Sequence, residues 1–139
     1  PLVDREMIGE ALARRRNRQA VEGGRAAVVV GDAEQLPWPD NTFTCCACVA
    51  TFLFFERPHA VLREIRRVLG PGGRVVIITP ARQPPGFVRS LLAPSEGGVG
   101  LYSQEEFEEM LRETGFTDID VELQSRRLVC QAMTSPDKL

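Results

Sequence analysis

The pattern that most constrains this chain is a strand, a helix and a second strand that follow one another within residues 44–79. The apolar run at 44–50 has the composition of a buried strand, and Pro58 opens an amphipathic helix expected at 58–69. The run LGPGG ends that helix, and a second apolar strand is expected at 74–79. Strands that alternate with helices in this way form parallel sheets, so the pattern predicts an α/β fold.

Further elements are expected on both sides of this unit. Before it, the sequence predicts a helix at 5–20 with Asp4 as its N-cap, and a short strand at 26–30 that is buried on both faces. After it, Ser103 is expected to cap a helix that runs to about Thr114, and 118–123 and 127–133 are expected to pair as an antiparallel hairpin. The fold class is therefore a Rossmann-like three-layer α/β sandwich with a mostly parallel sheet and an antiparallel C-terminal hairpin.

Residues 80–100 form a segment rich in proline and glycine that is too long for an ordinary connection. Such segments carry function in α/β folds, and we interpret this one as a lid or substrate loop. Ligands of open α/β sheets bind beyond the carboxyl ends of the strands. That rule predicts a site whose rim contains Asp32, Ala33, Ala50, Thr51 and Pro80.

The composition is that of one globular domain. With 139 residues, of which 43% are hydrophobic, the chain is large enough for one core and small for two. We expect a single domain at 1–134 and a disordered tail at 135–139. The net charge of −2 predicts no attraction to nucleic acid or to a membrane surface. No secretory signal or apolar run of transmembrane length is visible, which predicts a cytoplasmic protein.

The four cysteines include a CxxC at Cys45 and Cys48, which could suggest a metal site. Successive side chains of a strand point to opposite faces, so these two would diverge. Cys130 and the single His59 have no ligand spacing to complete a site. The sequence therefore predicts small buried thiols, with no metal and no disulfide.

Three motifs in order, GDAEQLPWPD at 31–40, EIRRVLGPGGRVVII at 64–78 and GFTDIDVEL at 115–123, carry a resemblance to a known family. Together they resemble the second half of a class I S-adenosylmethionine-dependent methyltransferase. The resemblance implies a small-molecule methyltransferase with S-adenosylmethionine as its cofactor and no nucleic-acid or membrane partner. A nicotinamide-binding protein is disfavoured, because no GxGxxG opens any helix.

The resemblance also implies four cofactor-binding residues. Asp32 matches the acid that accepts from the adenine amine, and Ala33 matches the residue whose backbone N–H donates to an adenine ring nitrogen. Met7 matches the family's helix pattern, and Ala50 is the last residue of the strand at 44–50. Asp32 could instead be a turn-forming carboxylate. Trp38 and Phe43 could stack on a ligand or simply pack together in the core.

The chain departs from the family pattern in several ways. No GxGxG loop follows a first strand, and Leu2 stands where the ribose-binding acid belongs. Leu53 and Phe54 replace a His pair near the reacting group, and Thr44 replaces an Asp, so we assign no catalytic residue. Methyl transfer from a sulfonium does not demand a general base, because positioning supplies much of the rate.

These departures lead to two alternatives for the function. In the first, the chain is a fragment of a longer enzyme that methylates a small molecule, and by itself it binds S-adenosylmethionine weakly or not at all. In the second, it is a non-catalytic remnant or scaffold that acts through association. Without a first strand, the strand at 44–50 has an open, uncharged edge, which predicts a homodimer formed through that edge or by exchange of the N-terminal helix.

Overall fold

The computed structural model describes residues 5–82 and 100–138, with side chains from Glu10 onward. The chain divides into two compact units, Pro1–Asp32 and Ala33–Leu139, and each is described by itself. The lid predicted at 80–100 lies almost entirely outside the described residues.

The first unit contains two helices in place of the single helix predicted at 5–20. Helix α1 (Arg5–Arg16) and helix α2 (Arg18–Glu22) are separated at Asn17. The Asn17 side chain donates to the carbonyl oxygen of Ala13 at 2.9 Å. The backbone N–H of Asn17 donates to the same oxygen at 3.1 Å, so the side chain shares this acceptor with the helical bond at the break.

The strand predicted at 26–30 is wrong, because these residues form no strand. Val29 and Val30 are 51% and 42% exposed, although the prediction placed them in a buried sheet. A strand requires a neighbour to accept and donate its backbone hydrogen bonds. Among the described residues no strand pairs with this segment, and apolar composition alone does not make one.

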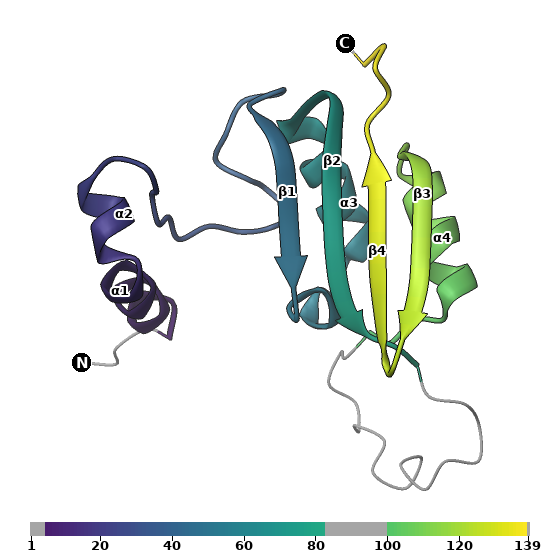
Figure 1. The fold of residues 1–139 in the computed structure, drawn as a ribbon, viewed down its shortest axis with the longest axis horizontal. Coiled ribbons are helices and arrows are strands. Elements are labelled where there is room, and N and C mark those ends of the chain that lie inside the picture. Colours follow the sequence, from purple (N-terminus) through teal and green to yellow (C-terminus); the bar gives the residue numbers. More distant parts are fainter. Residues whose placement is uncertain (1–4, 83–99, 139) are drawn as a thin grey trace, which may run out of the picture. The chain divides into compact units, whose positions relative to one another are not determined.

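The second unit is built on a four-stranded sheet with the order β1-β2-β4-β3. Figure 1 shows β1 (Phe43–Val49), β2 (Leu69–Pro80), β4 (Arg127–Met133) and β3 (Thr117–Gln124) side by side in that order. The pair β1 and β2 is parallel, whereas β4 is antiparallel to both β2 and β3. The predicted mixed sheet with an antiparallel C-terminal hairpin is therefore confirmed.

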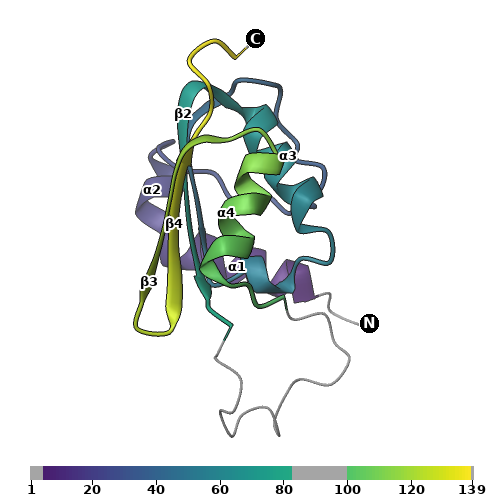
Figure 2. The same ribbon diagram turned by 90° about the vertical axis from the view of Figure 1, so that its right-hand side faces the viewer.

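Two helices cover one face of this sheet, as Figure 2 shows. Helix α3 (Pro58–Val68) is the crossover between β1 and β2, and helix α4 (Gln104–Glu113) precedes β3. Ser103 is the predicted N-cap of α4, and its hydroxyl accepts from the backbone N–H of Glu106 at 3.1 Å. Between these helices and the sheet lies the core, whose fully buried members include Phe52, Leu62, Ile77, Phe107, Leu111 and Leu128.

Strand β2 begins several residues earlier than predicted and takes in the glycine-rich run after α3. Phe43 pairs with Leu69, before the register shifts to the pair of Cys45 with Arg74. Gly72 adopts a φ of +67°, a left-handed conformation that glycine reaches without strain. The run therefore ends the helix as predicted and at the same time starts the strand.

Residues 135–138 have hydrogen bonds that the sequence pattern did not suggest. The Lys138 ammonium donates to the backbone carbonyl oxygens of Arg66, Arg67 and Leu69 at the end of α3. A cation at this position satisfies carbonyl groups that have no partner within the helix. The described part of the tail thus binds the end of α3.

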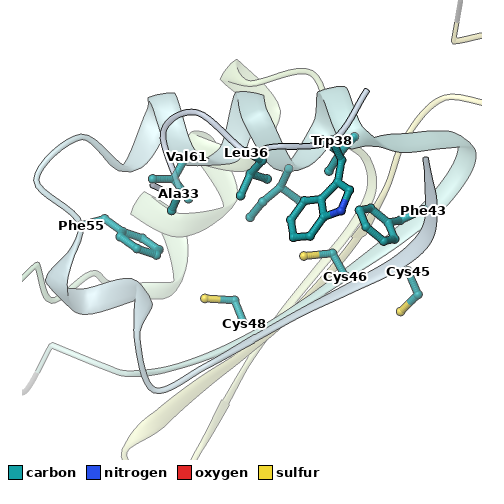
Figure 3. A pocket seen from close by; sticks show the side chains of 11 residues that line it. Ala33, Leu36, Trp38, Phe43, Cys45, Cys46, Cys48, Phe55 and Val61 are labelled. Atoms are coloured by element: carbon teal, nitrogen blue, oxygen red, sulfur yellow. The ribbon is translucent and has the colours of Figure 1, made fainter. Parts of the chain in front are cut away.

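The cysteines are less buried than predicted. Only Cys130 is buried, Cys46 and Cys48 are half-buried, Cys45 is exposed, and all four are free. The prediction failed at Cys45 because its side chain points to the face of the sheet opposite α3, and both helices of the second unit cover the other face (Figure 2 and Figure 3). Cys45 and Cys48 do point to opposite sides of this strand (Figure 3).

Candidate functional site

The predicted rim and cofactor-binding residues fall in both units of the chain. Met7 lies in α1, in the part whose side chains are not described, and Asp32 is the last residue of the first unit. Ala33 begins the second unit, which also contains Ala50, directly after β1. Within that unit, Ala33 is half-buried and packs against the hydrophobic core.

Ala50 and Pro80 lie at the end of the sheet where the parallel strands β1 and β2 both finish. The backbone N–H of Ala50 donates to the carbonyl oxygen of Ile78 at 2.9 Å. Ala50 has a φ of 59°, which is left-handed and costs about 1 kcal/mol for a residue with a Cβ. Strained backbone of this kind is concentrated at functional sites, and here it turns the chain sharply away from the sheet.

The adjoining residues offer little for acid–base chemistry. Thr51 follows Ala50, and its hydroxyl lies 3.1 Å from the Cys48 sulfur. Phe54, at one of the positions where the family often has a His pair, is 64% exposed in a short 3-10 helix. His59 is directed elsewhere, because its Nε2 contacts the Glu113 carboxylate at 2.9 Å. Among the described rim residues of the second unit, Ala33, Ala50, Thr51 and Pro80, none carries a carboxylate or an imidazole.

A pocket of about 290 Å³ opens between β1, α3 and the segment at 33–42, as Figure 3 shows. Trp38 and Phe43 form one wall as an edge-to-face pair with ring centroids 5.1 Å apart. This contact agrees with the interpretation of the two rings as packing partners, and both also face the cavity. The lining is almost wholly apolar and consists of Ala33, Leu36, Trp38, Phe43, Cys45, Cys46, Cys48, Phe55, Val61, Ile65 and Val68.

The Cys46 thiol in this pocket is a poor nucleophile at neutral pH. Burial, together with the smaller effects of the neighbouring Cys48 and Cys45, raises the pKa of Cys46 to about 11. The neutral thiol therefore dominates, and it behaves as a small apolar group. No group of three or more potential metal ligands gathers within residues 5–82 and 100–138. Over the same residues no helix is long and apolar enough to cross a membrane.

The sequence pattern did not indicate this pocket. Its one available signal was the alternation along β1, which places Cys46 and Cys48 on the side of α3. The cavity itself depends on how far the segment at 33–42 stands from the strand, and that distance has no counterpart in a local pattern.

Comparisons with known proteins agree with the fold and with the motifs. A family model described as "Methyltransferase domain" matches residues 3–77. The ubiquinone/menaquinone biosynthesis C-methyltransferase UbiE of Pseudomonas putida is 40% identical over 55 residues, which are 40% of this chain and 22% of that protein. UbiE of Neisseria meningitidis is 32% identical over 88 residues, or 63% of this chain and 33% of that protein. This chain thus spans a third or less of the length of these relatives.

Solved structures share the fold at lower identity. A possible histamine N-methyltransferase from Thermotoga maritima, described as S-adenosylmethionine-dependent, superposes with a TM-score of 0.70 at 21% identity, over 87% of this chain and 70% of that one. A similar methyltransferase from Aquifex aeolicus gives 0.69 at 22%, covering 94% and 65%. The [4+2]-cyclase SpnF gives 0.75 at 22%, covering 91% and 62%. Because one fold serves different reactions, these likenesses establish architecture alone.

Proposed function

Because this chain belongs to the class I S-adenosylmethionine-dependent methyltransferases, we propose that the full-length protein transfers a methyl group from S-adenosylmethionine to a small molecule. The observation that carries the proposal is the match of the family over residues 3–77, which includes the GDAEQLPWPD motif at the position of the adenine-reading pair. The UbiE relatives, which are C-methyltransferases of ubiquinone and menaquinone biosynthesis, favour a carbon atom of a compound of that kind as the acceptor, and the apolar pocket beside β1 is compatible with such chemistry.

The residues present fit the cofactor in part. We propose that Asp32 and the backbone N–H of Ala33 bind the adenine, and that Met7 and Ala50 are the other two cofactor-binding residues. The bound cofactor would supply an activated methyl group on a sulfonium. The chain's own residues would then orient the ligand and exclude water, since positioning supplies much of the rate of such transfers. The sequence has no GxGxG loop to approach the methionine end of the cofactor, so we derive no chemical step from this chain.

Calorimetric titration of S-adenosylhomocysteine tests the proposal. For residues 1–139 we expect a dissociation constant beyond millimolar, because each lost charged hydrogen-bond partner costs about 1.5 to 3 kcal/mol and a backbone cradle is missing as well. For the full-length protein we expect micromolar binding that Asp32→Ala weakens. Low-micromolar binding by residues 1–139 would contradict the expectation that this chain holds only part of the cofactor site. Absence of binding by the full-length protein would contradict the proposed function.

A second candidate, a scaffold that acts through dimerisation, is favoured by the edge of the sheet. In the described residues β1 pairs only with β2, and its sequence FTCCACV carries no charge to discourage pairing with another chain. We propose a homodimer formed across this edge or by exchange of the N-terminal helices. Sedimentation at tens of micromolar decides the matter, because a clean monomer with β1 protected from hydrogen exchange would exclude the dimer.

The four free cysteines fit a cytoplasmic location, which we propose as well.

A further inference from the structure

The segment formed by residues 33–42, here called the 33–42 loop, is held against α3 by one arginine. Arg67 donates through Nη2 to the carbonyl oxygen of Leu36 at 3.0 Å and through Nη1 to that of Trp38 at 2.9 Å. The same Nη1 also donates to the Asp40 carboxylate at 2.9 Å. A single guanidinium thus binds three points of a loop that lies outside the helices and strands.

Glu64, one turn before Arg67 on α3, fixes the orientation of this guanidinium. Its two carboxylate oxygens accept from Arg67 Nε at 2.6 Å and from Nη2 at 3.0 Å. One of these oxygens also accepts from the backbone N–H of Leu36 at 2.8 Å. Leu36 is therefore bound through both its N–H and its C=O. The side chains of Glu64 and Arg67 are only 17% and 31% exposed, which limits competition from water.

The loop has a second attachment at the opposite end of the same helix. Arg57, the N-cap residue of α3, pairs with the Glu34 carboxylate at 2.9 Å. Glu34 is the immediate neighbour of Ala33. The loop is thus bound at the first and the last turn of α3, and Figure 3 shows Ala33, Leu36 and Trp38 along that helix.

We propose that Arg67 and Glu64 are positioning residues, which hold the 33–42 loop so that the backbone N–H of Ala33 is presented to the adenine of the cofactor. This inference rests on the proposed function and deepens it. Without the pair, the loop would have to be ordered when the cofactor binds, and that entropy would be subtracted from the affinity. Lysine cannot replace Arg67, because it lacks the planar fork that reaches several acceptors at once.

Trp38 makes the loop directly observable, since it is the only tryptophan of the chain. In Arg67→Ala we expect acrylamide to quench Trp38 at least about twofold more efficiently, and the Leu36 amide to lose protection from hydrogen exchange. Arg67→Lys should recover little of the loss, and Glu64→Gln should be intermediate, because a glutamine can still accept from Leu36. Arg63→Ala is the matched control, an exposed arginine of the same helix, and should behave as wild type.

The binding arm uses the full-length protein with two probes, S-adenosylhomocysteine and S-inosylhomocysteine, in which hypoxanthine replaces adenine. Arg67→Ala should weaken the first by about tenfold and reduce the preference for adenine. A variant that is merely less folded would weaken both probes equally, and that outcome would overturn the inference, as would unchanged Trp38 quenching. If wild type binds neither probe, the proposed function fails and this positioning role fails with it, whereas the quenching result would still establish whether Arg67 orders the loop.

Discussion

Thr134 and Thr79 offer the same substitution at two sites of equal burial, and we expect valine to have opposite effects on the free energy of unfolding. Both side chains are 0% exposed. The Thr134 hydroxyl donates to the Gly70 carbonyl oxygen at 2.6 Å and accepts from the Gly73 N–H at 2.9 Å. The Thr79 hydroxyl, in contrast, has no hydrogen-bond partner among the described residues.

The magnitudes follow from the groups that each substitution leaves behind. Thr134→Val leaves the buried Gly73 N–H unpaired, at a cost of about 1 to 3 kcal/mol, and the half-buried Gly70 carbonyl adds a smaller penalty. We expect a loss of about 2 to 3 kcal/mol. Thr79→Val removes an unsatisfied hydroxyl without changing the shape of the side chain. We expect it to stabilise the protein by up to about 1 kcal/mol.

Urea unfolding followed by far-ultraviolet circular dichroism measures both effects, provided that the m-value is unchanged. Thr134→Ser is the control, because it keeps the hydroxyl and should lose only about 1 kcal/mol for one buried methyl group. The reasoning would be refuted if Thr134→Val were no more destabilising than Thr134→Ser. It would equally be refuted if the two valine variants shifted the midpoint in the same direction by the same amount.

Three further outcomes are expected. Ser103→Ala should lower the unfolding free energy by about 1 kcal/mol in the same assay, because α4 loses its N-cap, whereas Ser103→Asp should retain it. Iodoacetamide at pH 8 should label the exposed Cys45 first and the buried Cys130 only when the protein unfolds, since burial raises the pKa of Cys130 to about 12. Equal labelling rates of Cys45 and Cys130, measured by mass spectrometry, would contradict the fold. The hydrogen bond from Arg67 lowers the pKa of the Glu64 carboxyl from its usual 4.5. The ionised carboxylate therefore stabilises the folded protein fully above that pH, and this contribution is lost as the pH falls and the group is protonated. In Glu64→Gln the free energy of unfolding should therefore fall less steeply below about pH 4.5 than in wild type. If both proteins lose stability equally in acid, Glu64 is not the group responsible.

The sequence by itself determined the elements whose signals are local. The apolar spacing of α3, the capping serine of α4 and the two closely spaced runs of the C-terminal hairpin each lie within a few residues of what they control. The family could also be identified from linear motifs, and the match over 3–77 confirmed it. The cofactor contacts of Met7, Asp32, Ala33 and Ala50 remain predictions, since they concern a ligand that no local pattern can position.

Only the tertiary structure decided what depends on partners far apart in the chain. The apolar run at 26–30 looks like a strand, yet it forms none without a hydrogen-bonding neighbour, and Cys45 is exposed because it lies on the face of the sheet opposite α3 (Figure 3). Thr134 binds the glycine-rich start of β2 across 61 residues, and Arg67 binds Trp38 across 29. Such contacts form only after the chain has brought both groups together, because a hydrogen bond depends on distance and direction in space rather than on separation along the sequence.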